Sequence, residues 1–213
     1  MNKPAGKLFV ISAPSGAGKT SLVKELVHDD PQVDYSVSYT TRTKRDGEED
    51  GRDYFFVSRR EFEAMIGQGA FVEHARVFDN HYGTSREHIE AKLAEGKHVI
   101  LEIDWQGAEQ VRAAWPECIS IFILPPSRAE LERRLRNRAT DADDVIARRM
   151  GDAEAEMSHW KDFDFVVVND NFSHALKELQ RILRGKGEQS RVDRDELKPL
   201  VRNLLAGNSA ASD

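Results

Sequence analysis

The chain has 213 residues, 39% of them hydrophobic and 32% charged, an ordinary mix for a soluble protein with one α/β domain. Its formal net charge of −6 argues against nucleic acid or an acidic membrane as a partner, because the chain offers no overall positive field to either. The single cysteine, Cys118, excludes an intramolecular disulfide and favours a reducing cytoplasm. The first residues are too polar and too few for a signal peptide, and no apolar stretch approaches the roughly 20 residues of a membrane span.

The chain opens with a pattern typical of a strand, a glycine-rich turn and a helix. Residues 8–13 form a short apolar run that predicts a buried strand. Residues 19–28 have helical spacing, with Leu22 and Leu26 on one face, and Pro31 follows shortly after the predicted end.

The next segment, residues 35–82, is rich in predicted strands and breaks the alternation of strand and helix. Strands are expected at residues 35–41, 54–57 and 71–78, and a charged connection at residues 44–53. Ser58 and Glu61 predict a capping box for a helix that continues to Ile66. We interpret the segment as an inserted mixed β subdomain.

Buried strands and helices alternate in the remainder of the chain. Thr84 and Glu87 predict a second capping box, and Ser127 with Glu130 a third, which opens a very basic helix. Further strands are predicted at residues 98–104, 118–124 and 165–168. Helices are predicted at residues 84–96, 106–114, 128–137, 144–160, 172–183 and 195–205. Alternation of this kind favours an α/β fold with a parallel sheet of four or five strands and helices on both faces.

A phosphate-binding motif lies between the first predicted strand and helix. Residues 13–20 read A-P-S-G-A-G-K-T, which places a P-loop in the context that it requires. Gly16 and Gly18 allow backbone angles and a close approach to phosphate that a Cβ would hinder. Lys19 is predicted to bridge the β- and γ-phosphates, and Thr20 to place its hydroxyl on Mg²⁺. The predicted ATP-binding set here is Ala13, Pro14, Ser15, Gly16, Ala17, Gly18, Lys19 and Thr20.

The motif alone leaves three classes open: a GTPase, an ATPase and a small-molecule kinase. The N-K-x-D run of small GTPases is absent from the sequence. The position of the motif's usual first glycine is occupied by Ala13, the smallest substitute.

Longer strings of residues identify one family. They are S-V-S-Y-T-T-R-T-K-R (residues 36–45), G-E-E-D-G-R-D-Y-F-F-V (47–57), F-V-E-H-A (71–75), Y-G-T-S (82–85), L-E-I-D-W-Q-G-A (101–108), F-I-L-P-P-S (122–127) and V-V-N-D (167–170). With these strings the sequence resembles the guanylate kinase family, in its bacterial form, over about residues 7–184.

The resemblance implies a P-loop kinase fold with three parts. The core corresponds to residues 7–34, 83–126 and 150–184, the GMP-binding region to residues 35–82, and a helical lid to about residues 127–149. Residues 185–213 are predicted to be a peripheral C-terminal extension whose role stays open.

The resemblance also implies a GMP site. Its predicted members are Ser38, Arg42, Arg45, Tyr54, Glu73, Tyr82, Thr84 and Glu102. The residue types suit guanine: a carboxylate such as Glu73 accepts from N1–H and N2–H₂, and a hydroxyl such as Ser38 donates to O6. Arg42 and Arg45 would hold the phosphate as forks, with the two tyrosine hydroxyls adding hydrogen bonds. Many relatives have aspartate where this chain has Glu102.

The resemblance assigns the transfer step to Lys19 and to arginines of the lid. Arg138, Arg149 and Arg134 are the predicted catalytic arginines, while about half of the arginines in residues 128–149 are expected to be solvated charges. Asp104 is predicted to hold Mg²⁺ through water, and Asn169 to contact adenine. The usual lid glycines are replaced in the run R-N-R-A at residues 136–139.

The predicted reaction is ATP + GMP → ADP + GDP with Mg²⁺, in purine nucleotide metabolism of the cytoplasm. One rival is a non-catalytic guanylate-kinase-like module that binds protein ligands. The other is a kinase for a different nucleotide, such as UMP or AMP. The predicted partners are ATP and GMP, with no nucleic acid and no membrane. The oligomeric state, a homo-oligomer included, and the use of dGMP stay open.

Overall fold

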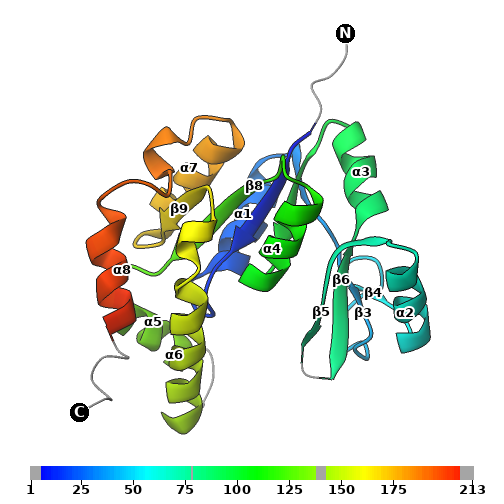
Figure 1. Cartoon of the computed structure of the whole chain (residues 1–213), viewed down its shortest axis with the longest axis horizontal. Helices are drawn as coiled ribbons and strands as arrows, with labels where there is room; N and C mark the ends of the chain where they lie inside the picture. The colour runs from blue at the N-terminus through cyan, green and yellow to red at the C-terminus, as the bar shows by residue number, and fades with distance from the viewer. Residues whose placement is uncertain (1–5, 78, 138–142, 207–213) are drawn as a thin grey trace. The chain divides into compact units, whose positions relative to one another are not determined.

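The computed structural model describes residues 6–77, 79–137 and 143–206, which form two sheets and the helices around them (Figure 1). The larger sheet has five strands in the order β2-β7-β1-β8-β9. Their bounds are Val33–Tyr35 for β2, His98–Glu102 for β7, Leu8–Ser12 for β1, Ile119–Leu124 for β8 and Phe165–Val168 for β9. The predicted parallel sheet and its upper strand count are confirmed, with parallel registers between β2 and β7 and between β8 and β9.

The central strands of this sheet are buried along nearly their whole length. Every residue of β1 is buried, and five of the six residues of β8 are buried as well. A strand that buries both alternating sets of side chains must be covered on both faces, as parallel sheets are. This is the physical reason that residues 8–12 read as a continuous apolar run.

The chain divides into two compact units, which are described separately. The first contains residues 6–10, Pro31–Leu101 and Gln106–Ile119, and the second contains Ile11–Asp30, Glu102–Trp105 and residues 120–206. The helices of the first unit are α2 (Arg59–Gly67), α3 (Arg86–Ala94) and α4 (Trp105–Ala114). The first residue of α4, Trp105, belongs to the second unit. The helices of the second are α1 (Lys19–Asp29), α5 (Arg128–Arg136), α6 (Asp143–Met157), the 3-10 turns η1 (Trp160–Asp162) and η2 (Glu188–Ser190), α7 (Phe172–Leu183) and α8 (Leu197–Leu205).

The first unit contains the smaller sheet, a mixed sheet in the order β4-β3-β6-β5. Its strands are β4 (Phe55–Phe56), β3 (Tyr39–Thr40), β6 (Asn80–Ser85) and β5 (Phe71–Val77). Phe62 of α2 is fully buried and stacks on Phe71, with ring centroids 4.6 Å apart. Gly83 allows this packing, because a Cβ there would come within 3.0 Å of the Phe62 ring.

Two local predictions were wrong. The predicted strand at residues 35–41 is two short strands, since β2 belongs to the larger sheet and β3 to the smaller one. The predicted helix cap at Thr84 is one residue early: Thr84 lies in β6, and the Ser85 side chain accepts the hydrogen bond of the helix that begins at Arg86. Both hydroxyl residues suit a cap, but β6 pairs through Ser85 and uses the Thr84 hydroxyl elsewhere.

The other helix signals were confirmed. Ser58 and Glu61 form the complete capping box that opens α2. The Ser127 side chain accepts from the backbone N–H of Glu130 at the start of α5.

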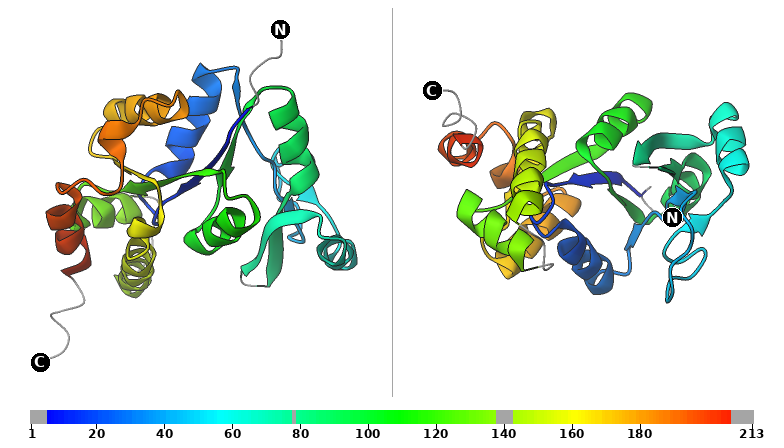
Figure 2. Two further views of the ribbon diagram at one scale, coloured as in Figure 1. Left: turned by 45° about the horizontal axis from the view of Figure 1, so that its top comes forward. Right: turned by 90° about the horizontal axis from the view of Figure 1, so that it is seen from below.

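The C-terminal extension is an ordered part of the second unit as far as residue 206. Leu197, Val201 and Leu204 of α8 are buried, and α8 packs against α6 (Figures 1 and 2, α8 in red). Arg194 also donates to the carbonyl of Val166 in β9 at 2.9 Å. The last part of the predicted extension, residues 207–213, lies outside the described residues. Within the described part of the chain, no helix is both long and apolar enough to cross a membrane.

Candidate active site

The phosphate-binding motif forms the turn between β1 and α1. Gly16 and Gly18 have φ angles of 90° and 95°, in the left-handed region that favours glycine. A Cβ on Gly18 would lie 2.5 Å from Nδ2 of Asn169. Gly18 is also the N-cap residue of α1 and provides no side-chain cap, so the positive end of the helix is presented to a ligand.

Lys19, the first residue of α1, is half-buried, and its amine donates to the carbonyl of Ile103 at 3.0 Å. Burial lowers the pKa of the Lys19 amine, and the carboxylates of Glu102, Asp104 and Glu156 oppose that shift. The next residue, Thr20, donates its hydroxyl to the Glu102 carboxylate. The motif therefore combines one half-buried cation with several nearby carboxylates that favour its charged form.

Helix α6 reaches the same turn with two side chains. The backbone N–H of Ser15 donates to Oε2 of Glu156 at 3.0 Å, and Arg149 Nη2 donates to the Ser15 hydroxyl at 3.2 Å. Burial raises the pKa of the Glu156 carboxyl, and the Ser15 N–H and Lys19 partly oppose the shift. These groups border a cavity of about 190 Å³, lined by Ala13, Pro14, Ser15, Gly16, Gly18, Lys19, Thr20, Asp104 and Glu156.

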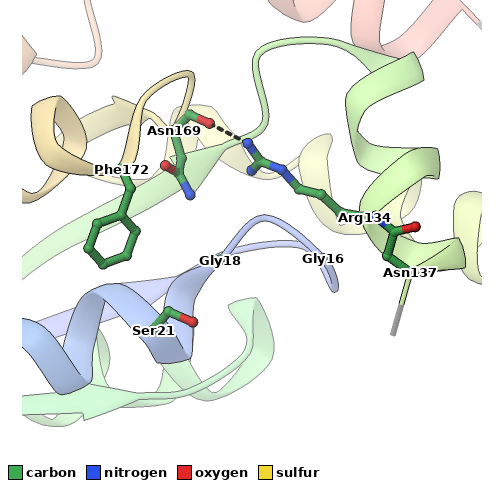
Figure 3. A pocket seen from close by; sticks show the side chains of 7 residues that line it. All are labelled: Gly16, Gly18, Ser21, Arg134, Asn137, Asn169 and Phe172. Carbon is green, nitrogen blue, oxygen red and sulfur yellow. Dashed lines mark hydrogen bonds between the residues drawn. The ribbon is translucent and has the colours of Figure 1, made fainter. Parts of the chain in front are cut away.

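A second cavity, of about 300 Å³, opens on the other side of the glycines (Figure 3). It is lined by Gly16, Gly18, Ser21, Arg134, Asn137, Asn169 and Phe172. Nδ2 of Asn169 donates to the carbonyl of Ala17 at 2.7 Å, and Arg134 Nη2 donates to the backbone carbonyl of Asn169 at 3.0 Å. Because a carbonyl requires a donor, the first bond fixes the amide orientation and turns Oδ1 toward the side of the Phe172 ring.

The arginines of α5 divide into two kinds. Arg133 is an exposed partner of Glu130, whereas Arg134 is half-buried and connects Glu130 to the P-loop turn. Together Arg133 and Arg134 lower the pKa of Glu130 to about 2. Arg136 is another exposed arginine and pairs with Glu132. Much of the basic character of α5 is therefore neutralised by carboxylates on the same helix.

In the first unit, a buried carboxylate lies in the smaller sheet. Glu73 of β5 is only 6% exposed and accepts the Thr84 hydroxyl of β6 at 2.5 Å. The two residues are opposite each other in the antiparallel register. The acid is therefore held on a rigid two-stranded element rather than on a loop.

An arginine and two tyrosines form a second polar group in this unit. The Arg42 guanidinium lies over the Tyr54 ring at 5.3 Å, and the Tyr54 and Tyr82 ring centroids are 5.9 Å apart. Arg42 Nη2 also pairs with Glu48 at 2.6 Å, and this hydrogen bond raises the pKa of Arg42. Glu48 accepts in addition from the backbone N–H of Arg45, whose side chain is exposed. The pair fixes one side of the Arg42 fork, which holds five N–H donors in all.

These two groups of residues match a known family. A family model described as guanylate kinase matches residues 5–186. The chain belongs to the guanylate kinase family.

Individual guanylate kinases are similar along most of the chain. The protein named guanylate kinase from Alkalilimnicola ehrlichii is 55% identical over 202 residues, which cover 94% of this chain and 98% of the relative. That from Salmonella typhimurium is 52% identical over 203 residues, with the same coverage. The crystal structure of guanylate kinase from Anaplasma phagocytophilum matches with a TM-score of 0.69 and 34% identity, and covers 92% of this chain and 95% of its own.

The predicted family and reaction are confirmed by these matches. Guanylate kinase activity is the ATP-dependent phosphorylation of GMP to GDP, and this chain is an enzyme of that kind. The relatives that match are named guanylate kinase, which favours this activity over the two rivals considered from the sequence, a non-catalytic module and a kinase for UMP or AMP.

The predicted guanylate kinase residues gather in the two units as follows. The P-loop residues, Asp104, Arg134, Arg149 and Asn169 lie together in the second unit, and the predicted GMP residues from Ser38 to Thr84 lie in the first. Glu102, predicted for GMP, lies in the second unit and accepts from Thr20. Arg138 and Ala139 lie outside the described residues.

Sequence reasoning missed four residues that line the cavities: Glu156 in the first, and Ser21, Asn137 and Phe172 in the second. A signal for Glu156 was present. It lies seven residues after Arg149, about two helical turns, so both side chains share one face of α6.

Proposed function

We propose that the guanylate kinase reaction of this chain uses residues 13–20 for ATP and a side-chain site in the first unit for GMP. The observation that carries the assignment of the acceptor is the buried carboxylate of Glu73, which the Thr84 hydroxyl holds in the smaller sheet. Burying a carboxylate costs free energy, and hydrogen bonds to the N–H donors of a base would offset that cost.

In the donor site, main-chain N–H groups bind the triphosphate. The turn with its two left-handed glycines and the start of α1 supply the amides, and Lys19 supplies a half-buried cation. Because these groups are held in place before ATP arrives, little reorganisation opposes binding or transfer.

The residues near Thr20 fit the Mg²⁺ that the reaction needs. The Thr20 hydroxyl, the Glu102 carboxylate bonded to it and the Asp104 carboxylate are all hard oxygen donors, which Mg²⁺ prefers. Thr20 would hold the ion directly and Asp104 through water. When bound, Mg²⁺ neutralises charge on the β- and γ-phosphate oxygens.

The second cavity suits the adenine of ATP. Asn169 presents Oδ1, an acceptor that complements the N6 amino group of adenine and opposes the O6 carbonyl of guanine. The Phe172 ring, which is 41% exposed, offers an apolar surface to a base. Arg134 holds the main chain of Asn169 in position.

In the acceptor site, Glu73 accepts the adjacent N1–H and N2–H₂ donors of guanine, and the Ser38 hydroxyl donates to O6. Adenine places an acceptor at N1, and two opposed acceptors cost about 1–3 kcal/mol per buried group. Arg42 and Arg45 hold the GMP phosphate, and the hydroxyls of Tyr54 and Tyr82 add hydrogen bonds.

The transfer itself needs charge stabilisation rather than a strong base, because the GMP phosphate is already anionic at neutral pH. Lys19 and Arg149 are the described cations that stabilise charge on the transferring phosphoryl group, and Arg138 is a further candidate. Closure of the predicted lid, residues 127–149, would exclude water, which would otherwise accept the phosphoryl group.

An assay of nucleoside diphosphate formation with ATP and each of GMP, AMP and UMP tests the proposal. We expect kcat/KM for GMP to exceed that for AMP by roughly 100-fold or more, from at least two mispaired polar contacts. Equal rates with AMP and GMP would remove the base assignment. The cytoplasmic location and the oligomeric state stay predictions, and gel filtration addresses the second.

A further inference from the structure

One carboxylate accepts a hydrogen bond from a backbone N–H that we assign to phosphate binding in the donor site. Glu156 is near the end of α6, 141 residues along the chain from Ser15, and accepts the Ser15 backbone N–H at 3.0 Å. Its carboxylate borders the cavity of about 190 Å³ together with Lys19 and Thr20, the residues predicted to meet the β- and γ-phosphates and the metal. An acid here is unexpected, since a triphosphate brings several negative charges to the same cavity.

The contact uses the recognition chemistry of a phosphate oxygen. Ser15 offers a main-chain N–H, and the Lys19 ammonium group contributes an attractive charge to Glu156. A carboxylate oxygen that accepts an N–H beside a cation satisfies that donor as an anionic phosphate oxygen would. A single N–H makes one strong hydrogen bond, so the carboxylate and a phosphate oxygen compete for it.

The same helix presents a cation to the same residue. Arg149 lies two turns before Glu156 on α6, and its guanidinium donates to the Ser15 hydroxyl at 3.2 Å. Arriving phosphate therefore repels Glu156 and attracts Arg149. Both effects act on one helix, and they favour a shift of α6 that removes the acid and keeps the arginine near the phosphate.

We propose that Glu156 is a competing anion of the ATP site, which holds the Ser15 amide until the terminal phosphate of ATP displaces it. The proposal rests on the assignment of residues 13–20 to ATP. Glu156 is then a specificity residue for the donor: it opposes ligands that reach the Ser15 amide more strongly than it opposes shorter ones. Its displacement couples phosphate binding to the position of α6, which also carries Arg149.

Protonation of Glu156 removes the competing charge. Burial raises the pKa of the Glu156 carboxyl, the Ser15 N–H and Lys19 lower it, and Asp104 and Asp152 raise it. Above this raised pKa the carboxyl is charged and competes, and below it the neutral acid competes less. Competition by Glu156 should therefore strengthen as pH rises through its pKa and fade toward acid pH.

The test compares equilibrium binding of ATP and of ADP, with Mg²⁺, to the wild-type chain and to Glu156→Gln. Glutamine keeps an acceptor for the Ser15 N–H but loses the charge. We expect Glu156→Gln to bind ATP about threefold to tenfold more tightly at pH 8, a range typical of one partly screened charge. The gain for ADP, which has no γ-phosphate, should be smaller. The ratio of wild-type to variant Kd for ATP should fall toward one as the pH is lowered through the raised pKa of Glu156, and this ratio cancels the titration of ATP itself.

Asp152→Asn is the matched control. Asp152 is exposed on the same helix, one turn before Glu156, and the substitution removes the same charge. We expect it to change Kd for ATP by less than about twofold, as surface charges do. Thermal unfolding of all three proteins identifies any loss of fold.

The outcomes separate the two proposals. Binding of ATP to Lys19→Met tests the donor-site assignment. If Lys19→Met binds ATP as tightly as the wild-type chain, or if the wild-type chain does not bind ATP, the assignment of residues 13–20 fails. If the wild-type chain and Glu156→Gln bind ATP equally at pH 8, or if Glu156→Gln binds ATP more weakly, the donor site stands and the competing-anion proposal is overturned. In steady-state assays the proposal requires a lower KM for ATP with an unchanged KM for GMP.

Discussion

The donor and acceptor sites that we propose for this chain bind their ligands with different kinds of groups. The donor site is a run of eight consecutive residues whose binding groups are mainly main-chain amides, shaped by Gly16 and Gly18. The acceptor site uses side chains from separate strands, among them Glu73 of β5 and Thr84 of β6. A site made of main chain tolerates many side-chain changes but depends on backbone conformation. A site made of side chains depends on each of them.

The two sites also differ in the hydrogen-bond partners of their acidic side chains. In the acceptor site Glu48 pairs with Arg42, whose fork has further N–H groups to offer a phosphate. In the donor site Glu156 pairs with the single N–H of Ser15. A carboxylate that pairs with a guanidinium orients it and leaves other N–H groups for the ligand. A carboxylate that accepts from the single N–H of an amide competes with the ligand for that N–H.

Among the side chains of the donor site, Lys19 should give the largest effect when it is replaced. We expect Lys19→Met to lower kcat/KM by about 10³-fold, because it removes a half-buried charge that is proposed to stabilise the transferring phosphoryl group. Lys24→Met, on the exposed face of the same helix, is the control and should stay near wild type. Retention of more than a tenth of the activity by Lys19→Met would contradict the assignment.

The acceptor site should be sensitive to a change of a single atom type. In Glu73→Gln one carboxylate oxygen becomes an NH₂ group, which opposes a guanine donor, so kcat/KM for GMP should fall by roughly 100-fold. The KM for ATP should be unchanged. The exposed substitution Glu63→Gln controls for charge. A similar loss for GMP and AMP would show that Glu73 supports the fold rather than reading the base.

In the donor site, the corresponding test changes the backbone conformation that a residue can adopt. Gly18→Ala should raise KM for ATP by about tenfold, because a left-handed alanine costs about 1–2 kcal/mol and its Cβ would meet Asn169. Gly67→Ala is the control, since a Cβ at Gly67 would meet nothing within 4 Å. Kinetics with ATP varied at saturating GMP measure the effect, and an unchanged KM for ATP in Gly18→Ala would contradict it.

The smallest effect is expected for replacement of an arginine that belongs to neither proposed site. Arg133→Gln should leave kcat and both KM values within about twofold, because Arg133 is an exposed partner of Glu130. Arg134→Gln, one residue further along α5, should raise KM for ATP, because Arg134 holds the carbonyl of Asn169. Equal behaviour of the two variants would remove the distinction between surface and site arginines in α5.

Short-range signals predicted much of this molecule. The P-loop was recognised from eight residues because its function requires glycine at two backbone positions and lysine and threonine at fixed places after them. The capping box of Ser58 and Glu61 was recognised for a similar reason, since the partners are three residues apart in any helix. Thr84 shows the limit: its local pattern fits a cap, but its hydroxyl bonds to Glu73 across a strand pair.

The sequence by itself determined the alternation of buried strands and helices, the phosphate-binding turn and the family, because each depends on residue types at short, regular spacings. Only the tertiary structure decided that residues 35–41 divide between two sheets, that Glu73 is buried against Thr84, and that Glu156 bonds to the amide of Ser15. Those contacts join residues 11 and 141 positions apart, and the free energy that selects them comes from packing of the whole unit. A local sequence pattern does not show which of several acidic residues on a helix accepts a hydrogen bond from a backbone amide of another element.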